Sequence, residues 1–250
     1  MRHEDLFYVL ALLNAEGVGN LTAKKLLEHY PTPEDIFKKG SRLGLKLPSI
    51  NSINKDDLFR RAEAELAFIE RNQIAVAYYK DADYPAALEH CVDAPVLLFS
   101  KGSFNFKNRK IISIVGTRQA TAFGVEFTRQ LISDLAPLDP IIVSGYAYGI
   151  DIAAHVSALE NNLTTIGVLA HGLDKIYPKQ HQKYAAQVLQ NGGFMTEFPS
   201  GIEPIRENFI RRNRIVAGLS QATIVIESAL KGGSLITAQM ANDYGREVFA

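Results

Sequence analysis

Hydrophobic residues change their spacing partway along this 250-residue chain. Up to about residue 105 they recur every three or four positions, as they do along one face of a helix. The clearest such runs are 6–13, 23–30 and 56–72. Beyond residue 105, short apolar runs rich in β-branched residues alternate with helical patterns. The first part is therefore expected to be helical, and the second to combine strands with helices.

The second part of the pattern predicts a parallel sheet. Its strands are apolar without alternation, which is typical of strands that helices cover on both faces. Right-handed crossovers then place the strand-to-helix loops at the carboxyl edge of the sheet, where ligands usually bind. Strands are expected at 111–115, 141–143, 164–169, 193–196, 223–226 and 247–249, with further candidates at 74–79 and 96–100. Helices are expected near 122–135, 150–160, 180–190, 205–217 and 234–244.

These elements predict an α/β fold: a Rossmann-like, mostly parallel sheet with helices on both faces, preceded by a small helical module. We place the module at residues 1–72 and the sheet domain at 73–250. The sequence stops within its last expected strand, so we expect the native protein to continue. Within the module, the glycine turn at 16–19 resembles a helix-hairpin-helix that could contact a DNA phosphate. A simple helix connection, or a surface for a partner, explains the same turn.

Composition narrows the functional classes. Lys+Arg and Asp+Glu both number 27, so the chain has no overall basic footprint, and binding to nucleic acid would need local clusters of cations. The single cysteine, Cys91, excludes an internal disulfide and every multi-cysteine metal site. No apolar run approaches the ~20 residues of a membrane span, and the first residues lack a signal-peptide pattern. We therefore expect a cytoplasmic protein without membrane association.

Candidate chemistry gathers in the loops that follow the expected strands. Gly116-Thr117-Arg118 lies between a strand and a helix, where free N–H groups and the helix dipole favour an anion. Thr117 adds a hydroxyl donor, and Arg118 adds a bidentate phosphate contact. A tight turn with a surface arginine explains these residues equally well. The loop lacks the GxGxxG fingerprint, which argues against NAD.

The loop after the next strand repeats this design. It begins with Ser144 and Gly145, and Gly149 permits a sharp turn or the close approach of a ligand. Asp151 is expected in the first turn of the following helix, where a carboxylate is favourable. His155 lies four residues further along the same helix face. Because a third metal ligand with suitable spacing is missing, we interpret His155 as structural.

Two more loops and an arginine cluster complete the set. Lys175 offers a point charge and Tyr177 a stacking face, although both also suit an ordinary loop surface. Gly233 and Ser234 precede a helix, where an N-cap serine is compatible with anion binding. The segment 211–214 gathers three arginines. Four loops of one design at one edge of a sheet predict a site for phosphates.

Five motifs occur in order along this part of the chain: GTR (116–118), SGYAYGIDIAAH (144–155), GLDKIYP (172–178), RNRIVAGLS (212–220) and GSLITA (233–238). With them, the chain resembles the DNA-processing protein A (DprA/Smf) family from about residue 84 to its end. It departs from the family pattern at three positions. Members commonly have a smaller aliphatic residue where Tyr146 stands, a small residue or cysteine where His171 stands, and proline where Ile210 stands. These departures affect loop rigidity and pocket lining but leave the cations intact.

The resemblance implies a function, partners and site residues. Family members are non-enzymatic proteins of natural transformation, competence and DNA recombination, which bind and protect single-stranded DNA and help load the RecA recombinase onto it. They have an extended Rossmann fold after a SAM-like helical module, are usually homodimers, and often carry a winged-helix domain downstream. The resemblance implies no catalytic residue, metal or cofactor. The DNA-binding residues that it implies are Gly116, Thr117, Arg118, Ser144, Gly145, Lys175, Arg211, Arg212, Arg214, Gly233 and Ser234.

Several anion sites along one edge suit the successive phosphates of a polymer. No base-reading chemistry is indicated, so binding should be largely non-specific and salt-sensitive. One arginine of 211–214 is a candidate for a structural role, through backbone carbonyls or Glu227, and the sequence does not identify which. Aromatic residues near the loops could stack bases, although we expect Phe209 in particular to pack in the core: Tyr146, Tyr148, Tyr177 and Phe209.

The alternative is a phosphoribohydrolase-like enzyme, which would process nucleotides on a related fold. In such enzymes a catalytic glutamate closely follows the glycine-rich loop. Here the loop at 232–237 offers no carboxylate, and Glu227 is the only reasonable substitute. A general acid or base must reach the reacting atom, and no convergent pair is apparent. We therefore expect a binding protein rather than an enzyme.

Overall fold

The computed structural model describes residues 1–39 and 55–250, which form two compact units. Unit 1 comprises residues 1–83 and 95–97, and unit 2 comprises residues 84–94 and 98–250. These units are defined by contacts within the structure. The domain limits expected from the sequence, 1–72 and 73–250, stay a prediction. No helix within the described residues is long and apolar enough to cross a membrane.

Unit 1 is mainly helical. Helix α1 packs on α2, α3 and α5 and buries Val9, Leu10 and Leu12. The turn between α1 and α2 contains Gly17 at φ +79°, a left-handed conformation that favours glycine. The elements of this unit are α1 (His3–Leu13), α2 (Asn20–His29), α3 (Pro33–Lys39), α5 (Lys55–Asn72) and β1 (Ala75–Tyr78).

Unit 2 contains the predicted sheet. Its strands lie in the order β2-β6-β5-β4-β3-β7-β8. All neighbours are parallel except β2, which pairs antiparallel with β6. The strands are β2 (Leu97–Gly102), β3 (Ile111–Gly116), β4 (Ile141–Ser144), β5 (Thr165–Val168), β6 (Gly192–Thr196), β7 (Ala222–Ile226) and β8 (Glu247–Phe249).

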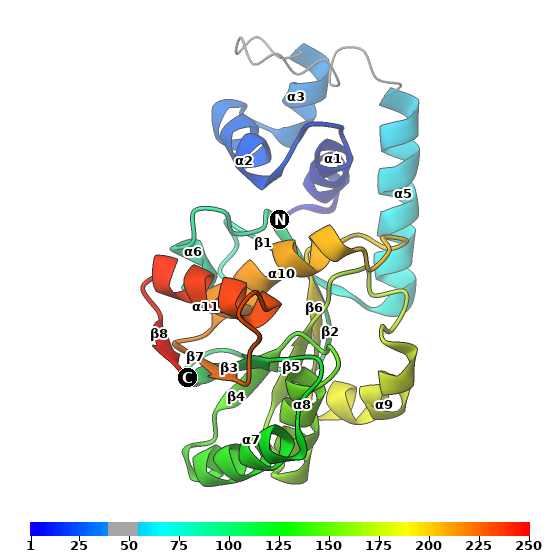
Figure 1. Cartoon of the computed structure of the whole chain (residues 1–250). Coiled ribbons are helices and arrows are strands. Elements are labelled where there is room, and N and C mark those ends of the chain that lie inside the picture. Colours follow the sequence, from blue (N-terminus) through cyan, green and yellow to red (C-terminus); the bar gives the residue numbers. More distant parts are fainter. Residues whose placement is uncertain (40–54) are drawn as a thin grey trace. The chain divides into compact units, whose positions relative to one another are not determined.

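Helices cover both faces of this sheet, as predicted (Figure 1). Helices α7, α8 and α9 pack on one face, and α10 and α11 on the other. On the first face, Ile114, Ile132 and Ile142 meet in a core that excludes water, and each contributes about 1.5–3 kcal/mol by its burial. The helices are α6 (Ala86–Glu89), α7 (Ala122–Leu135), α8 (Ile150–Glu160), α9 (Gln182–Gln190), α10 (Arg206–Leu219) and α11 (Gly233–Asp243).

The strand order creates a crevice at the carboxyl edge. Strand β3 leads to α7 on one face, whereas its neighbour β7 leads to α11 on the other, so the two connections diverge. Gly116 ends β3, and a Cβ there would lie 2.0 Å from the carbonyl oxygen of Ile226. The first residues after β4 and β7 include Tyr146 and Glu227, whose φ values are +58° and +52°. Unusual backbone of this kind is common beside functional sites.

His155 is a structural residue of this fold, in agreement with its interpretation from sequence. It is fully buried on α8, and its Nδ1 lies 2.7 Å from the Thr165 hydroxyl. Burial lowers the pKa of His155 to about 3 from an ordinary 6.5, and nearby Arg212 adds to this effect.

His155 should therefore make stability depend on pH. The unfolded chain takes up a proton as the pH falls below 6.5, whereas the folded chain does so only near 3, so stability is lost between these values. From pH 7 to pH 5 the loss is about 2 kcal/mol. Urea unfolding at both pH values measures it. His155→Gln should remove this part of the loss and the surface variant His90→Gln should retain it; equal losses in both would contradict the assignment.

Candidate functional site

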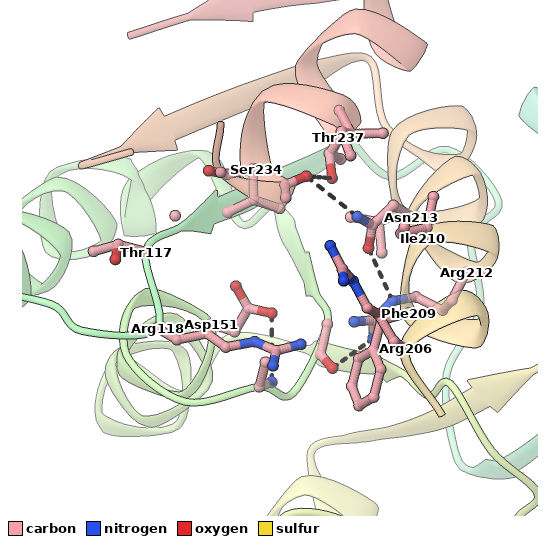
Figure 2. A pocket seen from close by; sticks show the side chains of 18 of the residues that line it. Thr117, Arg118, Asp151, Arg206, Phe209, Ile210, Arg212, Asn213, Ser234 and Thr237 are labelled. Atoms are coloured by element: carbon pink, nitrogen blue, oxygen red, sulfur yellow. Dashed lines mark hydrogen bonds between the residues drawn. The ribbon is translucent and has the colours of Figure 1, made fainter. Parts of the chain in front are cut away.

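A pocket of about 610 Å³ opens at the carboxyl edge of the unit 2 sheet (Figure 2). Its walls come from the loops after β3, β4, β5 and β7, from the first turns of α8 and α11, and from the first three turns of α10. The first N–H groups of a helix have no acceptor within the helix and carry partial positive charge. The sequence-predicted residues that line the pocket are Gly116, Thr117, Arg118, Gly145, Arg212, Gly233 and Ser234.

Arg118 and an aromatic ring form one wall. The Arg118 guanidinium lies 4.8 Å from the centre of the Phe209 ring, and Tyr177 meets the same ring edge-on at 5.9 Å. Phe209 is half-buried and lines the pocket, so the prediction that it packs in the core is wrong. Its position on α10 turns it away from the sheet and toward the cavity. Cation–π contact leaves the Arg118 N–H groups available for a ligand.

Arg212 forms the floor and is almost fully buried. Its Nη1 donates to the carbonyl oxygen of Gly145 at 2.5 Å and to that of Val168, and its Nε lies 3.3 Å from the Asn213 side-chain oxygen. These bonds tie α10 to the ends of β4 and β5. Burial lowers the pKa of Arg212 to about 10, while Asp151 opposes that shift, so the guanidinium stays charged at neutral pH. Arg212 is thus the arginine that holds the loops through backbone carbonyls.

Asp151 lies in the first turn of α8, as predicted, and its carboxylate is adjacent to Arg212 of α10. Its Oδ2 accepts a hydrogen bond from the Ala147 N–H at 3.4 Å. Burial raises the pKa of the Asp151 carboxyl, and the charge of Arg212 works in the opposite direction. Gly145 makes room for this pair, because a Cβ there would lie 2.4 Å from Arg212 Nη2 and 2.5 Å from Asp151 Oδ2.

Four predicted residues lie outside the pocket lining: Ser144, Lys175, Arg211 and Arg214. The Ser144 hydroxyl donates to the Ile114 carbonyl oxygen at 2.6 Å and is fully buried. Lys175 pairs with Glu203. Arg211 and Arg214 both reach Glu197, at 2.8 Å and 2.6 Å. These four side chains are therefore engaged within the protein.

Two of the candidate stacking residues also differ from expectation. Tyr146 is fully buried, and its hydroxyl donates to the His181 carbonyl oxygen at 3.0 Å. It packs against Phe194 in a second core cluster, so it cannot stack a base. Tyr148 is 39% exposed but lies outside the lining, where its hydroxyl contacts Gln180. Tyr177 alone of these three tyrosines lines the cavity.

Sequence reasoning missed four polar residues of the lining: Arg206, Asn213, Lys231 and Thr237. Arg206 and Asn213 lie seven positions apart on α10 and share the face that carries Phe209, so helical spacing could have found them. Lys231 is exposed in the loop before α11. Within residues 1–39 and 55–250, no carboxylate forms an ion pair with Arg118, Arg206 or Lys231.

The pocket offers little for bond-breaking chemistry. Glu227, the substitute considered for a catalytic glutamate, accepts hydrogen bonds from the N–H of Thr121, at 2.9 Å, and from its hydroxyl. These bonds lower the pKa of Glu227. Asp151 is the carboxylate of the lining. Among the described residues, no group of three or more His, Cys, Asp or Glu side chains could hold a metal ion.

Comparison with known proteins identifies relatives across the chain. The family model described as DNA recombination-mediator protein A matches residues 65–250. Protein Smf of Synechocystis sp. is 36% identical over 262 residues, which cover 100% of this chain and 65% of that protein. The chain thus spans less than two thirds of the length of this relative.

Solved structures are similar over the same region. DNA processing protein A from Streptococcus pneumoniae has a TM-score of 0.79 at 33% identity and covers 98% of this chain and 86% of its own. The protein of that name from Helicobacter pylori, whose structure concerns its single-stranded DNA binding mode, has a TM-score of 0.63 at 32% identity. It covers 70% of this chain and 79% of its own. These similarities support the predicted fold class.

Proposed function

Since the chain belongs to the DNA recombination-mediator protein A family, we propose that it binds single-stranded DNA in the pocket at the carboxyl edge. One observation carries this proposal. Arg118, Arg206 and Lys231 surround the first turns of α10 and α11 without a carboxylate partner in the described chain. Cations and helix N-termini together favour phosphate oxygens.

The aromatic wall supports a single strand rather than a duplex. In a single strand the bases are unpaired and can stack on a protein ring, whereas a duplex buries their faces. Phe209 and Tyr177 offer rings within the same cavity as the cations. Stacking on such rings contributes about 1–3 kcal/mol for each base.

We extend the proposal to the cellular role. The protein would act in the reducing cytoplasm during natural transformation and recombination, protect incoming strands as a homodimer, and help load the RecA recombinase onto them. The resemblance of five motifs to the DprA/Smf family supports this role. The residues proposed to contact DNA in the pocket are Gly116, Thr117, Arg118, Gly145, Arg206, Phe209, Arg212, Lys231, Gly233 and Ser234.

We further propose that the protein binds DNA without chemical turnover. Glu227 is occupied by Thr121, and Asp151 has no second acid or base beside it in the lining. Incubation with nucleoside monophosphates tests this point. No free base should appear, and its release would favour the phosphoribohydrolase-like alternative.

A salt titration tests the proposed function. Single-strand affinity should fall linearly with the logarithm of salt concentration, with a slope of about −0.7 for each phosphate engaged. Three unpaired cations predict a slope near −2. A duplex of equal length should bind more weakly at each salt concentration. Affinity that is independent of salt, or stronger for the duplex, would contradict the proposal.

Gly145→Ala tests the packing of the pocket floor. The added Cβ would lie 2.4 Å from Arg212 Nη2, so the guanidinium must move. We expect single-strand affinity to fall about tenfold, or about 1.4 kcal/mol. Gly201→Ala is the control outside the pocket. Gly201 has φ +79°, and an added Cβ would meet open space. The substitution should therefore strain the backbone but leave single-strand affinity unchanged. Equal affinity of Gly145→Ala and the wild type would show that the floor does not matter.

A further inference from the structure

Glu227 connects two of the loops that form the pocket. It is the first residue after β7, and it bonds to both ends of the segment 117–121, which connects β3 to α7. Its backbone carbonyl oxygen accepts a hydrogen bond from the Thr117 N–H at 2.7 Å. Its carboxylate accepts hydrogen bonds from the Thr121 N–H, at 2.9 Å, and from the Thr121 hydroxyl. One residue therefore fixes the start and the end of this segment.

Arg118 lies between these two attachments. Its side chain extends from the segment into the pocket, where it contacts Phe209 (Figure 2). The start of the segment is fixed through the backbone, since the Thr117 carbonyl oxygen also accepts a hydrogen bond from the Ile150 N–H at 3.2 Å. The end of the segment depends on the Glu227 carboxylate. Loss of that carboxylate would therefore release one end of the segment that carries Arg118 and leave the other in place.

The backbone of Glu227 is constrained at this position. Its φ is +52°, in the left-handed region that residues other than glycine rarely adopt. Such a conformation persists where the surrounding contacts determine it, and the bonds to Thr117 and Thr121 are contacts of this kind. The bonds from Thr121 also lower the pKa of the Glu227 carboxyl, so the group is ionised at neutral pH. The segment thus ends on a fixed, charged acceptor.

Gly124 leaves the space that this carboxylate occupies. Gly124 is buried in the first turn of α7. A Cβ at this position would lie 2.5 Å from the Glu227 Cδ, and the three atoms nearest to it would all belong to the Glu227 carboxylate. An added methyl group would therefore displace the carboxylate and disturb its bonds to Thr121. Substitution of Gly124 is thus a second way to release the segment, and it keeps the charge of Glu227.

A segment that is ordered before the ligand arrives loses little conformational entropy on binding. Glu227 lies outside the pocket lining, and its negative charge would by itself weaken the binding of phosphates. We propose that Glu227 is a positioning residue: it fixes the segment 117–121 so that Arg118 is presented to a phosphate of the bound strand. This inference rests on the proposed binding of single-stranded DNA. Positioning and charge predict opposite effects when Glu227 is removed.

Glu227→Ala should weaken the binding of an oligo-dT strand about tenfold, although the substitution removes a negative charge. In the Arg118→Ala background the same substitution should change affinity less than twofold, because the side chain that Glu227 positions is absent. Low salt keeps the affinity of the double variant measurable. Glu126→Ala is the control, since it removes the same charge from an exposed position on α7 and should not weaken binding.

Gly124→Ala tests the same contact while the carboxylate is present. Alanine forms helices better than glycine, and the group that must move is the end of a flexible side chain, so the variant should remain folded. A thermal melt checks the fold of each variant. We expect affinity to fall about tenfold in the wild-type background and to stay within twofold in the Glu227→Ala background.

The outcomes separate this inference from the proposed function. Unchanged or tighter binding by folded Glu227→Ala or folded Gly124→Ala overturns the positioning role and leaves single-strand binding in place. An equal loss from Glu227→Ala with and without Arg118 also overturns it, because Glu227 would then act through another group. Failure of the wild type to bind the strand overturns the proposed function, and this inference with it.

Discussion

Arg212→Ala should destabilise the protein by about 3–5 kcal/mol and abolish measurable single-strand binding. Arg212 is 3% exposed and bonds the carbonyl oxygens of Gly145 and Val168, so its loss leaves buried acceptors without a donor. Asp151 would also lose the neighbouring charge that opposes its desolvation. The shift in the urea midpoint, at an unchanged slope, measures the loss of stability.

Arg211→Ala is the matched control for this effect. Arg211 precedes Arg212 on α10, but its side chain is 50% exposed, and its partner Glu197 keeps a second ion pair with Arg214. A partly exposed ion pair of this kind contributes about 1 kcal/mol or less. Equal destabilisation by the two variants would contradict the assignment of Arg212 as the residue that joins the loops.

Arg118→Ala should weaken single-strand binding about 30-fold, which corresponds to about 2 kcal/mol, with little change in the urea midpoint. Arg118 is exposed, lines the pocket and contacts Phe209, so its removal takes away a phosphate contact and one side of the aromatic wall. Fluorescence anisotropy of a labelled oligo-dT strand measures the affinity.

Arg129→Ala on α7 is the control for Arg118→Ala. Arg129 lies outside the pocket and pairs with Glu160 at 3.3 Å, with its side chain 60% exposed. The Arg129→Ala substitution removes the same charge as Arg118→Ala. Because it lies away from the pocket, it should change single-strand affinity less than twofold at moderate salt. If both variants weakened binding to the same degree, overall charge rather than the pocket would determine affinity.

The sheet was predictable from the sequence because its strands are continuously apolar and alternate with helices. The strands expected at 111–115 and 193–196 are observed as β3 (Ile111–Gly116) and β6 (Gly192–Thr196). The handedness of the crossovers predicted that the strand-to-helix loops lie together at the carboxyl edge. In the structure, the loops at Gly116 and Gly233 line one pocket there. These inferences depend on repeated patterns rather than on single side chains.

The different roles of the arginines were not predictable from the sequence, because they depend on which face of α10 each residue occupies. A helix turns by about 100° at each residue, so Arg212 shares a face with Phe209 and faces the cavity, whereas Arg211 and Arg214 turn toward Glu197. The same phase brings Arg206 into the pocket. Sequence proximity grouped three arginines that helical geometry separates.

Individual side chains in the loops were the hardest to predict. Tyr146 follows β4 directly, and its φ of +58° accompanies a ring packed in the core, away from any ligand. A non-glycine residue rarely adopts this conformation, so a pattern of residue types does not reveal it. Asp151 was placed correctly in the first turn of α8, but its direction into the cavity required the structure.

Photo-crosslinking tests the central claim most directly, because it locates the bound strand on the protein. A single-stranded oligonucleotide that carries 5-iodouracil at every second position is irradiated with the wild-type protein, and the cross-linked residues are identified by mass spectrometry. We predict cross-links at Phe209 and Tyr177, the aromatic residues of the pocket, and their loss when unlabelled single strand is added in excess. Cross-links confined to unit 1, or to surfaces of unit 2 away from the carboxyl edge, would contradict the account.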